Sequence, residues 1–326
     1  MSLNPIEEIR RDISADLDRL TDRIAECLST GNPMLQAIVT ANLRNKGKLI
    51  RPMTVILAAQ LLGEVNEKVI DSAASVELLH NASLIHDDVV DASRTRRGAP
   101  TVNAVWDNHI AVLVGDYYVS TSMQLAIRTG NVHIIEAVCD LGRRLSLGEL
   151  DQIYNARYHT LTEDAYFQII DFKTASLFKA CVRMAAYACK ADGPAADVLT
   201  RYAELLGQAF QIRDDIFDYF DDTAIGKPTG NDLREGKITL PLLHVLLNDS
   251  LPQHEEMRAL AAGEELSDAD IERLLKYARD NGGIEYAYRR MAEMRDEAVR
   301  CLMTFPEHHA RQRLMQLFDY IIDRNY

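Results

Sequence analysis

Apolar residues recur at helical spacing along most of the chain, and no segment alternates apolar and polar positions as a half-buried strand would. Prolines fall at the boundaries between these apolar segments. The pattern predicts helices over Ile6–Ser29, Pro33–Asn42, Pro52–Leu62, Glu67–Ala92, Thr101–Thr129, Val132–Tyr158, Thr162–Lys173, Ala175–Lys190, Ala195–Phe220, Thr239–Asn248, Asp268–Asp280 and Ile284–Thr304, with a last helix ending near Arg324. Because no linker or low-complexity segment interrupts them, we predict one all-α domain over residues 1–326, a large helical bundle.

Two of the predicted helical segments, Ala111–Ala126 and Thr174–Ala188, are apolar most of the way round and should therefore be buried inside the bundle. Thr162 and Ser267 precede acidic residues, a combination that predicts capped helix starts. Gly63 is typical of a helix end.

Carboxylates are grouped twice in the same spacing, as DDVVD (Asp87, Asp88 and Asp91) and as DDIFD (Asp214, Asp215 and Asp218). Since successive helical residues are turned by about 100°, the first and last acid of each group share one helix face, one turn apart. Their repulsion costs a few tenths of a kcal/mol on a bare helix, and a hard divalent cation would offset it. One such group is usually a solvated face. Two copies on apolar helices favour a metal site.

Cationic residues accompany these acids. Arg94, Arg96 and Arg97 follow the first group, and arginine binds phosphate oxygens bidentately, so the segment suits a diphosphate–metal complex. The alternative is that these acids and arginines pair with one another. Lys48 and Arg51 lie in GKLIRP at a predicted helix start, where Pro52 suits the first helical position.

Other polar residues remain open to two interpretations. GKLIRP alone is more often a solvated basic turn, and His80, two turns before Asp87, more often a packed histidine than a ligand. Lys173 stands in an otherwise apolar run, where it either extends to solvent or faces a polar cavity. For Glu149 and Gln152, which share a helix face, a surface role is equally open. A Gly-rich loop downstream of the second acidic group carries Lys227 and Lys237.

Composition excludes several classes of protein. The net charge is −13 and no basic cluster is long, which argues against a nucleic-acid partner. Five cysteines without a CxxC pair indicate reduced thiols and a cytoplasmic location. The amphipathic, acidic N-terminus does not resemble a secretion signal, and the most apolar run, Met53–Leu62, is too short to span a bilayer.

Taken together, the motifs resemble those of the trans-isoprenyl diphosphate synthase (polyprenyl synthetase) family, most of all its long-chain members. The two acidic groups match the family's Asp-rich motifs, and GKLIRP, VELLHNASLIHDD, RRGAPT, FKTA, FQIRDD and GKPTGNDLREGKITLP follow its pattern in the same order. The resemblance covers Leu43 to Leu243. It implies an all-α bundle around a deep central cavity, usually a homodimer, with isopentenyl diphosphate and an allylic diphosphate as substrates and Mg²⁺ as cofactor.

The resemblance also assigns roles to individual residues. It implies that the isopentenyl diphosphate is held by Lys48, Arg51, His80 and Arg97. The allylic diphosphate would be held by Arg96, Lys173, Thr174, Gln211, Lys227 and Lys237. Mg²⁺ would be bound by Asp87, Asp91, Asp214 and Asp218, with Asp88 and Asp215 in support. Ala92 stands where relatives often carry an acid.

The product should be long. The growing chain must run from Asp87 toward the N-terminal end of its helix, so Ser83 and Ala82, one turn back, form the first layer of the tunnel. In short-product relatives these positions tend to hold bulky aromatics, whereas here both are small. From Glu67 to Asp87 the helix is roughly 30 Å long, with Leu79, Val76 and Met123 as deeper walls. We expect about C40, an octaprenyl chain as found on quinones, and contact with a membrane surface at product release.

Four other functions compete with this interpretation. A short-chain geranylgeranyl or farnesyl diphosphate synthase differs only in tunnel length. A terpene cyclase or head-to-head synthase also ionises allylic diphosphates, but a cyclase needs no second diphosphate pocket. A non-catalytic subunit of a heteromeric synthase would be expected to lose metal ligands, and both acidic groups are intact here. A helical scaffold protein would not explain the combined motifs.

Overall fold

The chain is almost wholly α-helical in the computed structural model, which describes residues 4–44, 47–96, 98–158, 162–220, 229–263 and 266–323. A hairpin of two short strands, β1 (Thr95–Arg96) and β2 (Ala99–Pro100), is the exception within these ranges. The helices are α1 (Pro5–Asp12), α2 (Ser14–Leu28), α3 (Pro33–Arg44), α4 (Ile50–Leu62), α5 (Glu67–Val90), α6 (Val102–Val105), α7 (Asn108–Arg128), α8 (Val132–Tyr158), α9 (Glu163–Ile170), the π-helix η1 (Asp171–Ala175), α10 (Ser176–Cys189), α11 (Pro194–Phe217), α12 (Asn231–Arg234), α13 (Leu240–Leu246), α14 (His254–Ala261), α15 (Asp268–Asp280), α16 (Gly283–Met303) and α17 (His309–Asp323). The predicted all-α class is confirmed.

The contacts divide the chain into two compact units. The first comprises Met1–Arg143, Leu177–Ala203 and Cys301–Tyr320, and the second Arg144–Ser176, Glu204–Arg300 and Ile321–Tyr326. The acidic group of α5 belongs to the first unit and that of α11 to the second. The single domain predicted over the whole chain stays a prediction.

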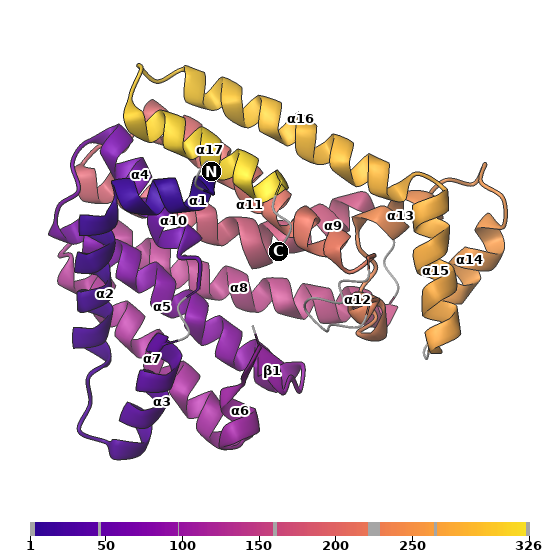
Figure 1. Ribbon diagram of the computed structural model, residues 1–326, viewed down its shortest axis with the longest axis horizontal. Coiled ribbons are helices and arrows are strands. Elements are labelled where there is room, and N and C mark those ends of the chain that lie inside the picture. The colour runs from indigo at the N-terminus through magenta and orange to yellow at the C-terminus, as the bar shows by residue number, and fades with distance from the viewer. Residues whose placement is uncertain are drawn as a thin grey trace. The chain divides into compact units, whose positions relative to one another are not determined.

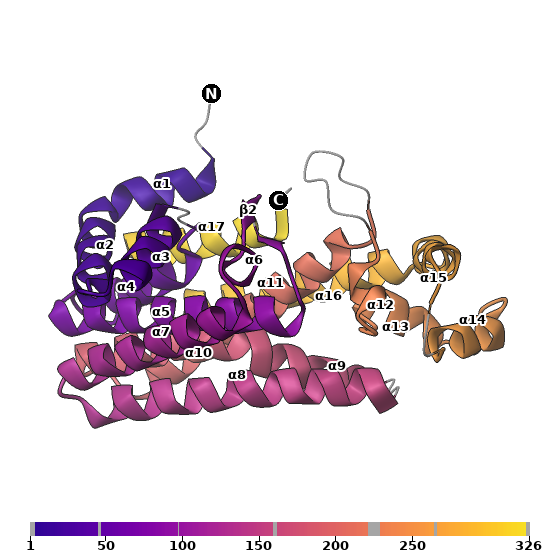
Figure 2. The same cartoon turned by 90° about the horizontal axis from the view of Figure 1, so that it is seen from below.

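In the first unit, α5 and α7 lie side by side (Figures 1 and 2). Gly115 makes this close approach feasible, because a Cβ there would lie 2.2 Å from His86 Nε2. Deeper in the same interface, Ser75 Oγ donates to the carbonyl of Ser122 at 2.8 Å. Helix α2 packs on the far end of α5, where the buried Asp71 binds the Arg23 guanidinium. The helix that carries the first acidic group is thus fixed along its length.

In the second unit, α13, α14 and α15 pack together (Figure 2). Helix α15 begins at a capping box in which Ser267 and Asp270 bind each other's backbone N–H, as the sequence predicts. Helix α9 begins at Thr162, whose side chain accepts the N–H of Ala165, again as predicted. These caps confirm the two helix starts.

Several predicted helices are interrupted. The segment predicted over Ile6–Ser29 breaks at Ile13, although the apolar spacing continues across the break and Ile13 is itself buried, so the pattern could not reveal it. The segment predicted over Thr101–Thr129 breaks after α6, because Asp107 caps α7 by accepting the N–H of Ile110 at 2.8 Å. Helix α4 begins at Ile50, which makes Pro52 its third residue and corrects the predicted first position.

Two short helices were not predicted. Helix α12 lies inside the segment predicted as a Gly-rich loop. Helix α14 follows Gln253, which adopts a left-handed conformation (φ 60°). With eight residues and three of them buried, α14 is too short for a clear helical period.

The burial expected of the two apolar segments is half right. Most residues of Thr174–Ala188 are buried as predicted. On α7, however, Ala111, Val114 and Tyr118 face α5, while the opposite face exposes Val112, Leu113, Met123 and Ile127. Among the described helices, α7 alone is long and apolar enough to cross a membrane by length and composition, a test that core helices of water-soluble proteins also meet.

Candidate active site

The first acidic group closes α5 in the first unit. The helix ends at Val90, but the N–H of Asp91 still donates to the carbonyl of Asp87 at 2.8 Å, so these two residues remain one turn apart. Asp88 is buried, Asp87 is half-buried and Asp91 is exposed. Ala92 then takes a left-handed conformation (φ 49°), which turns the chain out of the helix.

Asp88 is engaged by an arginine of the hairpin. Arg96 Nε and Nη2 contact Asp88 Oδ1 at 2.8 and 2.7 Å. Burial raises the pKa of Asp88, and the guanidinium of Arg96 opposes that rise. Asp88 and Arg96 therefore pair with each other, which is the alternative that the sequence left open for these acids and arginines. Both side chains line a cavity of the first unit between α2, α3, α5 and the hairpin. Arg97 lies outside the described residues.

The residues predicted to hold isopentenyl diphosphate also belong to the first unit. Lys48 Nζ lies 5.5 Å from the centre of the Tyr320 ring, and the Arg51 guanidinium lies 5.3 Å from that of Phe178. Both are cation–π distances, at which the aromatic ring attracts the cation but leaves its charge in place. His80 is buried on α5, 7% exposed, so it is a packed residue whatever else it binds.

The second acidic group closes α11 in the second unit. Asp214 is half-buried and Asp215 is buried. Asp218 follows the end of the helix, and its two carboxylate oxygens accept the N–H groups of Asn231 and Asp232, both at 3.0 Å. Asp218 therefore holds the start of α12 in place.

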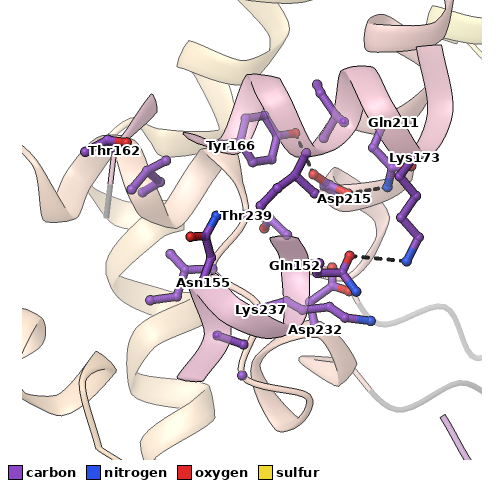
Figure 3. Close-up of a pocket in the computed structure, with 16 residues that line it drawn as sticks. Gln152, Asn155, Thr162, Tyr166, Lys173, Gln211, Asp215, Asp232, Lys237 and Thr239 are labelled. Carbon is purple, nitrogen blue, oxygen red and sulfur yellow. Dashed lines mark hydrogen bonds between the residues drawn. The ribbon is translucent and has the colours of Figure 1, made fainter. Parts of the chain in front are cut away.

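A cavity within the second unit collects three of the six predicted allylic-site residues (Figure 3). Lys173, Gln211, Asp215 and Lys237 line it, as does Asp232. The rest of its lining is Gln152, Asn155, Ala156, Thr162, Tyr166, Ile169, Ile170, Gly236, Ile238, Thr239 and Leu243. Lys227 lies outside the described residues.

Asp215 is the most connected carboxylate of this cavity. Tyr166 Oη donates to Asp215 Oδ2 at 2.6 Å, and Gln211 Nε2 donates to Oδ1 at 2.8 Å, as the dashed lines of Figure 3 show. Thr174 Oγ1 in turn donates to Gln211 Oε1 at 2.6 Å. Burial raises the pKa of Asp215 to about 6, while the two hydrogen bonds it accepts act in the opposite direction.

Lys173 projects from the π-helix η1, a distortion that often marks functional sites. Its Nζ lies 2.7 Å from Glu149 Oε2 and 3.2 Å from Gln152 Oε1, both on α8. Gly148 makes this meeting feasible, because a Cβ there would lie 2.9 Å from the backbone nitrogen of Lys173. The sequence left a site role and a surface role equally open for Glu149 and Gln152. In the structure both contact a lysine that lines the cavity.

Negative charge is concentrated in and beside the cavity of the second unit. Burial is the largest cause that raises the pKa values of Asp218 and Asp232, and the charges of Asp215 and Asp218 raise that of Asp232 further. Lys237 acts in the opposite direction on Asp232. A bound cation would relieve this concentration of carboxylates.

The donor set fits Mg²⁺. It consists of carboxylate oxygens, which Mg²⁺ prefers, and within the described ranges no three acidic, His or Cys side chains converge to hold a metal by themselves. Mg²⁺ is usually held by one or two carboxylates together with substrate phosphates and water.

The predicted tunnel residues of α5 are mostly buried. Ala82, Leu79 and Val76 are buried, and Ser83 is half-buried with its Oγ donating to the carbonyl of His80 at 2.9 Å. Met123 departs from expectation. It is 39% exposed on the outer face of α7, because that helix turns its other face to α5.

Sequence reasoning missed Tyr166 and Asp232 as site residues. Tyr166 stands seven positions before Lys173, a two-turn spacing that could have indicated a shared face. Asp232 stands in the same Gly-rich segment as the predicted Lys227 and Lys237. An acidic residue beside these lysines could have indicated a site residue.

Comparison with known proteins agrees with this fold. Residues 32–278 match the family model described as polyprenyl synthetase. An octaprenyl diphosphate synthase of Haemophilus influenzae is 34% identical over 99% of this chain and 98% of that protein. A polyprenyl synthase of Caulobacter crescentus, solved with calcium and isoprenyl diphosphate, superposes with a TM-score of 0.91 at 31% identity over 100% of both chains. A geranylgeranyl pyrophosphate synthase of Bacteroides thetaiotaomicron superposes with a TM-score of 0.85 at 36% identity, over 99% of this chain and 100% of that one.

The fold is thus the all-α isoprenoid synthase fold, and the protein is a prenyltransferase. The chain belongs to the polyprenyl synthetase family.

Proposed function

We propose that the chain is a Mg²⁺-dependent trans-polyprenyl diphosphate synthase that adds isopentenyl diphosphate units to an allylic diphosphate such as farnesyl diphosphate. The observation that carries this proposal is the cavity of the second unit, where Lys173 and Lys237 accompany the carboxylates of Asp215 and Asp232. Cations beside carboxylates suit a diphosphate that arrives with divalent metal.

The chain's own residues would act on the allylic substrate through charge. Lys173, Lys237 and Arg96 bind the diphosphate and stabilise the negative charge that develops on it as its bond to the allylic carbon breaks. Asp87, Asp91, Asp214 and Asp218 would hold Mg²⁺, which would supply further charge neutralisation to that leaving group. Ionisation of the allylic diphosphate needs no side-chain nucleophile.

The second substrate would be held by a separate group of cations. Lys48, Arg51, His80 and Arg97 would bind the diphosphate of isopentenyl diphosphate and aim its double bond at the allylic cation. The new carbon–carbon bond forms there, and the proton that the product loses passes to the released diphosphate. Two diphosphate pockets favour a synthase over a terpene cyclase.

We propose a product near C40, for use as a quinone side chain. The support is the pair of small residues, Ala82 and Ser83, on the helix before Asp87. The octaprenyl relative agrees with this length. The geranylgeranyl relative, at comparable identity, supports a shorter product as the second candidate, so similarity alone does not decide between them. A non-catalytic role in a heteromer is not favoured, since the six carboxylates of both acidic groups are present.

We further propose a cytoplasmic homodimer, with no nucleic-acid partner, that contacts a membrane surface when a long product leaves. The apolar outer face of α7, with Leu113 67% and Ile127 60% exposed, supports association with a second copy.

The test is incubation of the purified chain with isopentenyl diphosphate and farnesyl diphosphate, with and without Mg²⁺, followed by mass spectrometry of the extracted products. We expect polyprenyl diphosphate only with the metal. Asp87→Ala and Asp214→Ala should each reduce turnover by about 100-fold or more, because each removes a carboxylate that would hold the Mg²⁺ whose charge neutralises the leaving group. Near wild-type turnover in either variant would refute the requirement for both acidic groups.

A further inference from the structure

The carboxylate of Asp215 is fixed by two hydrogen bonds from different helices. Tyr166 Oη, on α9, donates to Oδ2 at 2.6 Å, and Gln211 Nε2, one turn earlier on α11, donates to Oδ1 at 2.8 Å. Asp215 is 5% exposed. Because each oxygen has its own donor and the group is buried, its plane cannot rotate without breaking a charge-assisted hydrogen bond. Figure 3 shows the carboxylate between the two donors.

This fixed carboxylate determines the orientation of the Gln211 amide. The NH₂ group must face Asp215, since the opposite orientation would set the amide oxygen against a carboxylate oxygen. The amide oxygen therefore faces Thr174, whose Oγ1 donates to it at 2.6 Å. The hydroxyl proton of Thr174 is committed in turn. The hydrogen bonds thus converge on Asp215. Thr174 donates to Gln211, which donates to Asp215, and Tyr166 donates to the other oxygen of Asp215.

Tyr166 is itself held firmly. Helix α9 begins at the Thr162 cap, and its next residue, Glu163, accepts from Tyr286 Oη at 2.6 Å and from Arg290 Nη1 at 2.7 Å, both on α16. The Arg290 guanidinium also lies 4.9 Å from the centre of the Phe167 ring. The residues on both sides of Tyr166 are therefore anchored to α16, so its hydroxyl meets Asp215 from a rigid support.

We propose that Tyr166 is a positioning residue for the allylic diphosphate, which acts through Asp215 to hold the Gln211 amide in the orientation that leaves its second N–H for that diphosphate. The proposal rests on the proposed function and on the family resemblance, which implies that Gln211 contacts that diphosphate. In this scheme Asp215 orients Gln211 through the hydrogen bonds that its two oxygens accept. Tyr166 does not touch the reacting atoms in this scheme.

The decisive variant is Tyr166→Phe, which removes one oxygen and leaves the ring in place. A hydrogen bond to a charged group is the stronger kind, so its loss should lower kcat/KM for farnesyl diphosphate about 10- to 100-fold. The KM for isopentenyl diphosphate should change less than about twofold, because its predicted cations lie elsewhere in the chain. Calorimetric binding of an unreactive thio analogue of farnesyl diphosphate, with Mg²⁺, should weaken by a similar factor. This last readout does not depend on turnover.

Tyr202→Phe is the matched control. Tyr202 is fully buried, and its Oη donates to the carbonyl of Leu314 at 2.7 Å, so this variant also loses one buried hydrogen bond. It should lower the melting temperature about as much as Tyr166→Phe, without changing farnesyl kinetics or analogue binding. A role of Tyr166 in stability alone would make the two variants behave alike, and that result would overturn the proposal.

A double-mutant cycle tests the route through Gln211. Gln211→Ala removes the group that Tyr166 is proposed to orient, so Tyr166→Phe should cost little further in that background, whereas additive losses would overturn the relay. Asp215→Asn interrupts the same relay at its centre, should Tyr166→Phe fold poorly. It can present an N–H to Gln211, and wild-type farnesyl kcat/KM in this variant would equally refute the proposal. A wild-type chain that forms no prenyl product would instead refute the proposed function.

Discussion

Ala82 has no exposed surface on α5, whereas the neighbouring Ser83 is half-buried, so the two small residues of the predicted tunnel wall should respond differently to added volume. Ser83→Phe can place its ring along the helix with little displacement of neighbours, and Ala82→Phe must displace them at a cost of about 1–3 kcal/mol. We expect both to shorten the product from about C40 to about C15–C20, and Ala82→Phe also to lower the melting temperature. Mass spectrometry of the extracted products measures the length.

Ile85→Phe is the control for Ser83→Phe. Ile85 is two residues beyond Ser83 and thus about 160° away around the helix, where it lines the cavity of the first unit. Its product length should equal that of the wild type. A wild-type product of C15 or C20, or an unchanged length in Ser83→Phe, would show that these positions do not set the tunnel.

Lys173 and Lys48 should separate the two substrates. Lys173 contacts Glu149 and Gln152 in the cavity of the second unit, and Lys48 lies over Tyr320 in the first. Lys173→Ala should raise the KM for farnesyl diphosphate about 10-fold or more, and Lys48→Ala that for isopentenyl diphosphate, because each removes charge-assisted contacts to one substrate. Lys179→Ala, on α10, should change neither. Steady-state kinetics with each substrate varied in turn provides the measurement, and equal effects of both variants on both substrates would contradict two pockets.

Individual residues were predictable from the sequence where several motifs combined. Spacing alone indicated a shared helix face for Asp87 and Asp91, and the N–H of Asp91 keeps that turn in the structure. Partners were not predictable, because they come from distant parts of the chain. Asp215 meets Tyr166 across 49 positions, and Asp218 meets Asn231 and Asp232 through backbone groups that carry no residue-specific signal.

At the scale of elements, the approach of α8 to η1 depends on Gly148. An added Cβ would lie 2.9 Å from the backbone nitrogen of Lys173 and 3.0 Å from Phe172 Cβ, so the π-helix must move. Gly148→Ala should destabilise the protein by about 1–3 kcal/mol through overpacking. It should also lower kcat/KM for farnesyl diphosphate, since Lys173 and Thr174 sit on the displaced segment. Thermal unfolding and kinetics measure the two effects.

Gly142→Ala is its matched control on the same helix. A Cβ at Gly142 would meet nothing within 4 Å, so this variant should gain about 0.5–1 kcal/mol of stability from helix propensity and keep wild-type kinetics. If Gly148→Ala kept wild-type stability and kinetics as Gly142→Ala should, the close approach of α8 to η1 would not be needed for activity.

Elements were predictable where local chemistry marks them, and this limit has a physical basis. The capping box of Ser267 and Asp270 is local, and α15 begins where the sequence predicts. The break at Ile13 leaves the apolar period intact, and the π-helix at Asp171–Ala175 adds one residue to a turn without changing composition. Both are decided by packing of neighbouring elements, which a one-dimensional pattern does not contain.

At the scale of the whole molecule, the outer face of α7 is the clearest departure from the predicted burial. The sequence shows a helix apolar most of the way round, yet Ala111 and Val114 face α5 while Leu113 and Ile127 remain 67% and 60% exposed. A second copy of the chain would bury the exposed residues and so reconcile the apolar pattern with the structure. The apolar pattern of α7 thus predicts the burial of its outer face correctly only if the chain forms a dimer through that face.

The homodimer can be tested on this face. Leu113→Glu and Ile127→Glu should each raise the dimer Kd at least about 10-fold, because burying one such side chain contributes about 1.5–3 kcal/mol and a buried glutamate adds a penalty. Met303→Glu, at a residue 58% exposed on α16, should leave the Kd unchanged. Sedimentation velocity measures association. Trp106 provides a second signal. It is the only tryptophan of the chain, lies just before α7 and is 42% exposed. Its fluorescence emission should shift to longer wavelength as the dimer dissociates on dilution. A wild-type chain that sediments as a monomer at micromolar concentration, or a Kd equally insensitive to all three substitutions, would exclude this face as the dimer interface.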